Sequence, residues 1–267
     1  MNALSPAITT SSATELVVSI EGVSKRFISS RGSIDAITET SLAIDQGLFV
    51  SLVGPSGCGK TTMLRMVAGL ETPTTGSITV RGETVTGAGA HVGIMFQHSV
   101  LLPWLDVIGN ILLPIEIGKK RKRDYVGRAF ELLQLVHLDG FGHHRIAELS
   151  GGMQQRVAIC RALIMDPSVL LMDEPFGSLD SMTREQLNDL LLDVCAATRK
   201  TTILVTHDID EAVYLGDKVV IMSPRPSRVI KVMDVDLDRS RHYAARREPA
   251  FGEYTAEVRQ LLGLGSS

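Results

Sequence analysis

The sequence has few aromatic residues and no excess of positive charge. Aromatic side chains make up 4% of its 267 residues, and 27 basic side chains stand against 30 acidic ones, for a formal net charge of −3. A dedicated nucleic-acid binder usually carries a strongly basic surface. The composition therefore predicts no nucleic-acid partner.

Long apolar runs and a regular cysteine pattern are also missing. No run approaches the roughly 18 apolar residues that a membrane-spanning helix needs. Residues 1–14 lack the basic leader and apolar core of a secretory signal, and their Ser/Thr richness predicts a disordered tail. The cysteines are odd in number and irregularly spaced, which excludes a disulfide framework and indicates a reduced cytosol. They are Cys58, Cys160 and Cys195.

Short β-branched runs alternate with helical stretches, the pattern of a parallel sheet covered by helices. The segment before Val53 and residues 76–85 are divided by turns too close together for crossovers, which indicates antiparallel strands. Residues 99–157 change to a helical pattern. After Pro224 the chain is Arg-rich and irregular, ending in an amphipathic stretch at 255–264. Strands are expected at 16–23, 49–53, 77–80, 92–96, 169–172, 202–206 and 218–222.

The strongest local motif is 54-GPSGCGKTT-62, which lies between a strand and a helix. It fits the phosphate-loop template, in which glycines turn successive N–H groups toward one point at a helix N-terminus. Lys60 is expected to neutralise the β- and γ-phosphates, and the Thr61 hydroxyl to coordinate Mg²⁺. The positive potential also predicts a reactive Cys58 thiolate. The expected phosphate-binding residues are Gly54, Pro55, Ser56, Gly57, Cys58, Gly59, Lys60, Thr61 and Thr62.

A second motif, 169-VLLMDEP-175, places two carboxylates after an apolar run. In such sheets ligands bind in the crevice at the carboxyl ends of the strands. Asp173 is therefore expected to hold Mg²⁺ through water, and Glu174 to polarise the attacking water. Taken alone, this motif fits a surface turn as well as a catalytic site. Its occurrence together with a phosphate loop favours the catalytic site.

Further motifs complete a recognisable order along the chain. They are 149-LSGGMQQR-156, 177-GSLD-180 and an isolated His207 after the strand at 202–206. With them the chain resembles the ATP-binding subunit of an ABC transporter over roughly residues 15–225. The resemblance implies an α/β fold: a P-loop NTPase (RecA-like) core with an antiparallel β subdomain and a helical subdomain inserted at about 98–158. Residues 226–267 would form a short C-terminal extension.

The resemblance also implies roles for individual residues. Phe27 would stack on adenine, unless it is a core aromatic residue. Gln97 would contact Mg²⁺ and the attacking water, and His207 would stabilise charge on the γ-phosphate. Two copies would face each other head to tail, with Asp180 linking the two ATP sites. The signature residues of one copy would then meet the γ-phosphate on the other; they are Ser150, Gly151 and Gly152.

Two segments, 97-QHSVLLPWLDVIGNI-111 and 222-MSPRPSRVI-230, resemble the nitrate, sulfonate and taurine importer group. This resemblance implies an ATPase that energises uptake of a small oxyanion nutrient, with aliphatic sulfonate or taurine first and nitrate second. Its partners would be a second copy, membrane permease subunits and, indirectly, a solute-binding protein, at the cytoplasmic face of the inner membrane. Two positions differ from the residues usual in this group. Leu48 stands where an acidic residue is common, and 108-IGN-110 is not the group's usual sequence.

Two alternatives belong to other classes. A soluble ABC ATPase of the DNA-repair or translation type would carry long coiled coils or two cassettes, and this chain shows neither. A P-loop GTPase would carry Asn-Lys-x-Asp, which is absent.

The basic run 119–123 is either a solvated face or a contact for a partner or anionic lipid. Trp104 is either a core residue or an exposed anchor for the permease. The pair His143 and His144 lacks metal-ligand spacing.

Overall fold

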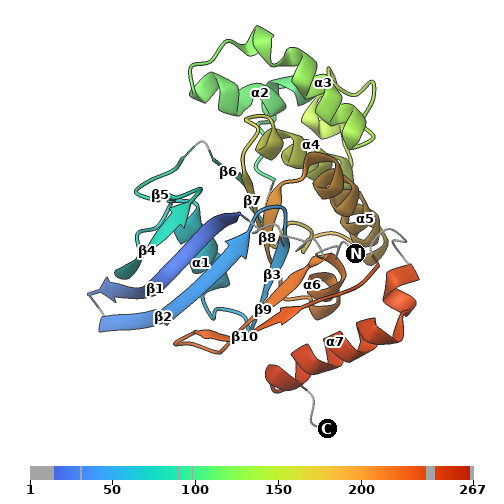
Figure 1. Cartoon of the computed structure of the whole chain (residues 1–267). Coiled ribbons are helices and arrows are strands. Elements are labelled where there is room, and N and C mark those ends of the chain that lie inside the picture. Colours follow the sequence, from blue (N-terminus) through green and yellow to red (C-terminus); the bar gives the residue numbers. More distant parts are fainter. Residues whose placement is uncertain (1–14, 31, 90, 98, 239–243, 265–267) are drawn as a thin grey trace, which may run out of the picture.

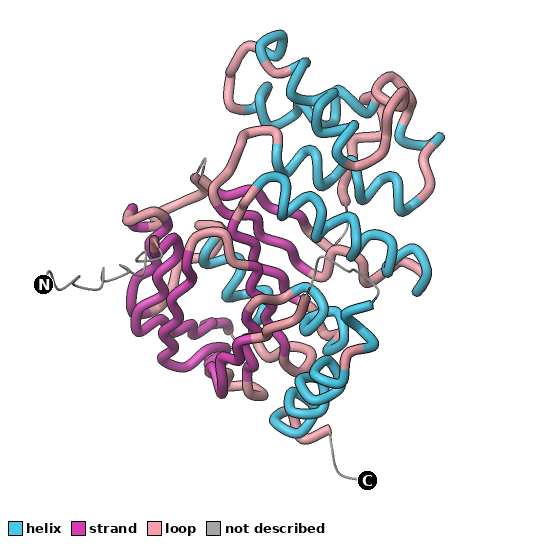
Figure 2. The backbone as a smooth tube through the Cα atoms, turned by 45° about the vertical axis from the view of Figure 1, so that its right-hand side comes forward, coloured by secondary structure: helices cyan, strands magenta, loops and turns pink. Residues whose placement is uncertain are grey.

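The computed structural model describes residues 15–264, except 31, 90, 98 and 239–243. The expected disordered tail at 1–14 lies outside this range. Among the described residues no helix combines the length and the apolar character needed to cross a membrane. Figures 1 and 2 show a strand-rich part and a helix-rich part, with α7 along one side of the strands.

The main sheet has the order β10-β9-β3-β8-β7-β6, and its strands run parallel except that β10 pairs antiparallel to β9. Every residue of β3, β7 and β8 is buried, which explains why these strands are mostly apolar and do not alternate with exposed polar positions. The strands are β3 (Phe49–Val53), β6 (Val92–Met95), β7 (Val169–Asp173), β8 (Thr201–Val205), β9 (Lys218–Met222) and β10 (Val229–Asp234).

The second sheet is antiparallel, with the order β2-β1-β4-β5. The expected antiparallel strands at 76–85 are confirmed by the pairing of β4 with β1 and β5. Buried residues of β1 and β4, such as Ile20 and Ile78, share one apolar core with Leu64 of α1 (Lys60–Val67), which lies against this sheet (Figure 1). The strands are β1 (Leu16–Ser29), β2 (Gly32–Asp45), β4 (Thr75–Val80) and β5 (Glu83–Thr84).

Helices gather at the upper end of the molecule in Figure 1. Here α2 (Val107–Ile117), α3 (Val126–Leu135) and α4 (Gly151–Leu163) pack on one another around a common core. Within the helical region expected from about 99, the first helix is α2, and Asp106 caps its start by accepting the N–H of Gly109. Short 3₁₀ turns lie at Lys122–Asp124 and Ile146–Glu148. The other helices are α5 (Ser181–Thr198), α6 (Ile209–Leu215) and α7 (Pro249–Leu261).

The expectation of an irregular chain after Pro224 is wrong for β10. This strand pairs with β9, and Met233 joins the apolar core formed by α6 and α7. Only Met233 of the strand is buried, so its sequence shows no clear alternation, and the free edge of β9 decides its conformation. The amphipathic stretch expected at 255–264 is helical but begins earlier, at Pro249, a residue favoured in the first turn. The division of the chain at 225 stays a prediction.

Candidate active site

The phosphate loop connects β3 to α1 and depends on its glycines for its shape. Gly57 and Gly59 have φ values of +73° and +118°, in the left-handed region that side chains disfavour. A Cβ at Gly54 would lie 2.8 Å from the carbonyl oxygen of Met222. The glycines therefore allow the chain to turn tightly and to present its N–H groups at the start of α1.

The Lys60 side chain lies within the loop itself. It is 5% exposed, and its ammonium donates to the carbonyl oxygens of Gly54 at 2.7 Å and Pro55 at 3.1 Å. Next to it is an open cavity of about 170 Å³, large enough for several phosphate oxygens. The cavity is lined by Ser56, Gly57, Gly59, Lys60, Thr61, Thr62, Glu174 and Arg225.

Thr61 and Asp173, which are far apart in the sequence, meet at the end of the main sheet. The Thr61 hydroxyl donates to Oδ1 of Asp173 at 2.8 Å. Burial raises the pKa of the Asp173 carboxyl, and the charge of Glu174 raises it further, against the opposing hydrogen bond from Thr61 and the charges of Arg65 and Lys60. A hydroxyl and a carboxylate are hard oxygen donors, so this pair fits Mg²⁺.

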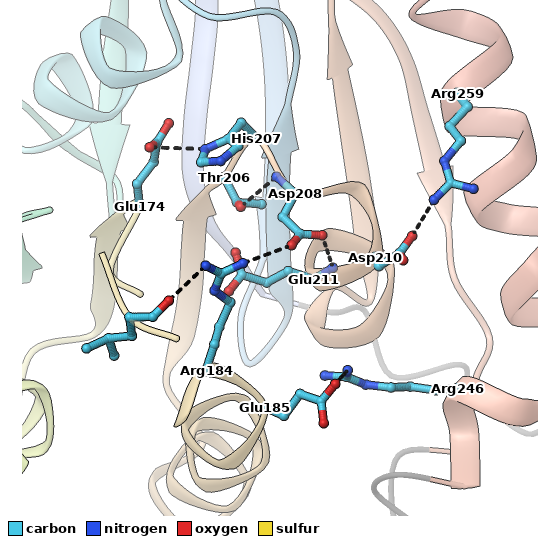
Figure 3. A network of polar contacts seen from close by, with 11 residues as sticks. Glu174, Arg184, Glu185, Thr206, His207, Asp208, Asp210, Glu211, Arg246 and Arg259 are labelled. Carbon is cyan, nitrogen blue, oxygen red and sulfur yellow. Dashed lines mark hydrogen bonds and ion pairs between the residues drawn. The ribbon is translucent and has the colours of Figure 1, made fainter. Parts of the chain in front are cut away.

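Glu174 and His207 face each other across the ends of β7 and β8 (Figure 3). Nδ1 of His207 lies 3.1 Å from Oε2 of Glu174. Glu174 has a left-handed backbone with φ of +45°, held by its N–H bond to the carbonyl of Val205 at 2.8 Å. Such strain persists where the surrounding structure imposes it and is common at functional sites. A carboxylate and an imidazole so placed can hold and orient a water molecule.

The signature residues lie at a different place in the same chain. Ser150 caps α4, its hydroxyl accepting the N–H of Met153 at 3.3 Å, and it is exposed. Residues 150–152 do not line the phosphate cavity. They adjoin the start of α5 instead, because a Cβ on Gly152 would lie 2.8 Å from Cγ2 of Thr183. The signature therefore forms a separate surface from the phosphate loop.

Asp180 belongs to this second surface. It caps α5, and hydrogen bonds from the backbone N–H and then the hydroxyl of Thr183 lower the pKa of its carboxyl. The exposed carboxylate thus stays ionised and is held in one orientation. Asp180 does not line the phosphate cavity in its own chain.

Phe27 and Gln97 lie at the edges of the site. Phe27, on β1, is 41% exposed with the ammonium of Lys25 5.0 Å from its ring centre, so the alternative of a core residue is wrong. Gln97 is exposed and follows β6, whose Met95 pairs with Met172 of β7 just before Asp173. Both side chains are therefore available to a ligand or a partner.

Arg225 is a site residue that the motif search missed. It comes from the turn between β9 and β10, lines the phosphate cavity, and donates to the carbonyl oxygen of Gly57 at 2.6 Å. Arg225 lies within 222-MSPRPSRVI-230, a segment that resembles the importer group but carries no phosphate-binding motif. The contact depends on β10 turning back along β9, which the sequence did not show.

The expectation of a reactive Cys58 is wrong. Its side chain is 1% exposed and belongs to the apolar core that includes Met63 and Leu64 of α1. Although Cys58 lies in the phosphate loop, its thiol points away from the cavity and does not line it. A thiol without access to solvent does not react with large reagents, whatever the local potential.

Two segments of the helical region lie at its surface. Trp104 is 76% exposed, so it is not a core tryptophan. The basic run 119–123 is exposed along its length, and Lys122 forms an ion pair with Glu116 at 2.5 Å. This exposure is expected both of a solvated face and of a contact for a partner or anionic lipid, so both alternatives stay predictions.

Comparison with known proteins identifies the family. The sequence profile described as ABC transporter matches residues 37–177. The taurine import ATP-binding protein TauB of Burkholderia pseudomallei is 44% identical over 248 residues, covering 90% of this chain and 95% of that protein. The nitrate import ATP-binding protein NrtD of Synechocystis sp. is 40% identical, with 91% and 94% covered. The aliphatic sulfonates import ATP-binding protein SsuB of Bacillus cereus is 41% identical, with 94% and 97% covered.

Solved structures agree with the sequence comparison. The dimeric structure of MJ0796, a bacterial ABC transporter cassette, matches with a TM-score of 0.71 at 33% identity, covering 82% of this chain and 99% of that one. A post-hydrolysis state of the same cassette, bound to ADP and phosphate, matches with a TM-score of 0.70.

This chain therefore belongs to the ABC transporter family. It has the fold of the ATP-binding cassette and is an ATPase coupled to transport. The expected fold class is confirmed, and the alternative of a soluble DNA-repair or translation ATPase is not supported.

Proposed function

We propose that this chain is the ATP-hydrolysing subunit of an importer for a small oxyanion nutrient. Its relatives are named for import of taurine, aliphatic sulfonates and nitrate, and we place taurine or an aliphatic sulfonate first and nitrate second. The contact between Glu174 and His207, next to the Thr61–Asp173 pair, carries the enzymatic part of the proposal.

Each residue at the phosphate cavity has a distinct task. The N–H groups of residues 54–62 bind the phosphate oxygens, and the Lys60 ammonium moves from the loop's carbonyls to the β- and γ-phosphates. Thr61 and Asp173 hold Mg²⁺, with Gln97 reaching the same ion; Mg²⁺ supplies charge neutralisation of the phosphates. Exposed Phe27 stacks on adenine.

Glu174 and His207 act on the attacking water and the γ-phosphate. Glu174 accepts a proton from the water as it attacks, and His207 donates a hydrogen bond to the phosphate on which negative charge develops. Their contact at 3.1 Å keeps His207 beside Glu174, which lines the phosphate cavity. Either side chain alone would leave the water or the phosphate without a partner.

The second copy completes the site. Ser150, Gly151 and Gly152 offer a helix N-terminus to the γ-phosphate bound by the other copy, and Asp180 links the two sites. The exposure of Ser150 and Asp180 and their place outside the phosphate cavity support this arrangement. ATP binding then closes the dimer and hydrolysis reopens it.

The membrane permease is the proposed partner of the region from Gln97 to Trp104. An aromatic side chain that is 76% exposed, close in sequence to a residue that contacts the ion, suits an anchor for a helix of another subunit. The subunit would then lie peripherally at the cytoplasmic face of the inner membrane, with a solute-binding protein acting through the permease.

The variant Glu174→Gln tests the enzymatic proposal. It should bind MgATP normally but lose turnover by at least about 100-fold, because the water is no longer deprotonated. Gel filtration with ATP should then show a dimer. The matched control Glu185→Gln changes an exposed carboxylate that pairs with Arg246 and should behave like the unmodified chain. A monomer with bound ATP, or normal turnover in Glu174→Gln, would contradict the proposal.

The substrate requires the complete transporter, because the ATPase subunit does not contact it. After reconstitution with its co-purifying permease and binding protein, ATPase activity should rise with taurine or an alkane sulfonate. Stimulation by nitrate alone would reverse our order of preference. No stimulation by any of the three would remove the proposed substrate class and leave the ATPase assignment intact.

A further inference from the structure

Arg184 is a partly buried cation that the proposed catalytic steps do not use. It lies one turn into α5, where its N–H donates to the carbonyl of Asp180. Its side chain turns back, and Nη2 donates to the carbonyl oxygen of Leu179 at 3.0 Å. The guanidinium is therefore attached to the loop 177–180 that precedes its own helix.

The other side of the guanidinium reaches the loop that carries His207 (Figure 3). Nη1 of Arg184 lies 3.5 Å from Oδ2 of Asp208, the residue after His207. Asp208 is itself held in place: its N–H donates to Oγ1 of Thr206 at 3.0 Å, and its Oδ1 accepts the N–H of Glu211 at 3.1 Å. The guanidinium therefore contacts the side chain of the residue next to His207, and that residue is tied to Thr206 and to the start of α6.

The space around this ion pair is small. It is a pocket of about 10 Å³ that is partly open to solvent, since His207, one of its lining residues, is 56% exposed. Glu211 contributes a buried carboxyl whose pKa is raised, first by burial and then by the charge of Asp208. The cavity is lined by Glu174, Gly177, Arg184, Thr206, His207, Asp208 and Glu211.

We propose that Arg184 is a positioning residue that couples the loop 177–180, which faces the second copy, to His207. This inference rests on the proposed roles of His207 and of the dimer. When the second copy contacts Asp180, the rigid, planar guanidinium carries the displacement of Leu179 to Asp208 and sets the distance between His207 and Glu174. A lysine has one nitrogen on a flexible chain and cannot hold both contacts in a fixed geometry.

Arg259 provides a matched control. It also pairs with an aspartate of α6, since Nη2 lies 2.9 Å from Oδ1 of Asp210, but it comes from α7 and is exposed. Removing it deletes an arginine–aspartate pair close to His207 without touching loop 177–180. A merely stabilising role for Arg184 predicts similar behaviour from both variants.

The test compares Arg184→Ala, Arg184→Lys and Arg259→Ala in the full chain and, in parallel, in a His207→Ala background. Arg184→Ala should lower kcat about tenfold with KM for ATP changed less than about twofold, the size expected for loss of a charged hydrogen bond. Arg184→Lys should fall between Arg184→Ala and the unmodified chain, and Arg259→Ala should be unchanged. In the His207→Ala background, single-turnover rates should be the same with or without Arg184.

Two results overturn the inference. One is an unchanged kcat in Arg184→Ala; the other is the same fold loss with and without His207, which means Arg184 acts independently of the histidine. Thermal unfolding identifies variants that fail to fold. If Arg184→Ala fails to fold, Arg184→Lys is compared with the unmodified chain in its place. Full kcat in His207→Ala alone would instead remove the proposed role of His207, and the two failures are thus distinguishable.

Discussion

The phosphate loop and the signature segment are both glycine-containing helix starts, but they have different surroundings. Helix α1 begins at the carboxyl ends of parallel strands, beside the buried ammonium of Lys60 and the carboxyl of Asp173. Helix α4 begins in the helical region, where exposed Ser150 is joined by glycines and by the start of α5. One helix start has a cation and a cavity; at the other, the residues that the structure describes offer N–H groups and the hydroxyl of Ser150.

This difference explains why a single copy would form half of each proposed site. A helix N-terminus alone attracts an anion weakly at an exposed surface. The phosphate loop adds a buried cation and side chains suited to Mg²⁺, so it can bind a nucleotide by itself. The signature surface gains a ligand only when a second copy brings its bound phosphates.

Lys60→Ala should have the largest effect, and on the phosphate loop alone. Removing a buried cation that binds phosphate should weaken ATP binding by about 10- to 100-fold. Isothermal titration with MgATP measures this loss. Lys120→Ala, at an exposed lysine of the basic run, is the control and should bind normally. Normal affinity in Lys60→Ala would contradict the assignment of the cavity.

Ser150→Asp should affect the signature surface alone. Aspartate is as good an N-cap as serine, so α4 should remain intact. Its charge would repel the γ-phosphate on the other copy. Dimer formation with ATP, measured by gel filtration in a Glu174→Gln background, should fall at least about tenfold. ATP binding to the monomer should be unchanged. The control Ser150→Thr keeps both the hydroxyl and the N-cap and should still form the dimer. Loss of ATP binding by the Ser150→Asp monomer would show that the signature surface and the phosphate loop are not separate.

Glu211→Gln should change how stability depends on pH. Burial raises the pKa of Glu211 above its ordinary 4.5, so the folded chain keeps this proton to higher pH than the unfolded chain. Stability is therefore lost as pH rises through that interval, with a slope of at most about 1.4 kcal/mol per pH unit. Urea unfolding across pH should show a shallower decline in Glu211→Gln, whereas the exposed Glu185→Gln should follow the unmodified chain. Identical pH profiles would contradict the burial of this charge.

Trp104→Ala should have the smallest effect on the isolated subunit. An exposed side chain contributes less than about 0.5 kcal/mol to the free energy of unfolding, so stability and basal ATPase activity should persist. In the unmodified chain, the fluorescence emission of Trp104, its single tryptophan, should be red-shifted and quenchable. It should shift to the blue when the permease is added. Phe176→Ala, at a fully buried position, should cost about 3–5 kcal/mol by contrast. Unfolding of Trp104→Ala would show that the residue belongs to the core.

Much of the fold and site follows from local pattern. The buried strands β3, β7 and β8 are mostly apolar, and the loop after β3 has glycines where φ is positive, so both could be predicted. Strand β10 could not be predicted in this way. It forms because an edge of β9 is available, and weak local preferences do not reveal such pairing. The start of α2, in contrast, has a local cause, because Asp106 caps the helix by accepting the N–H of Gly109.

The sequence by itself determined the class of chemistry, because the glycines, Lys60 and the consecutive carboxylates of Asp173 and Glu174 have few other uses in that order. Only the tertiary structure decided which groups meet. It buries the thiol of Cys58, exposes Trp104, and brings Arg184 between two loops. The physical reason is that motif chemistry is encoded in residue type and spacing, whereas burial and contacts depend on how strands and helices distant in the chain pack together.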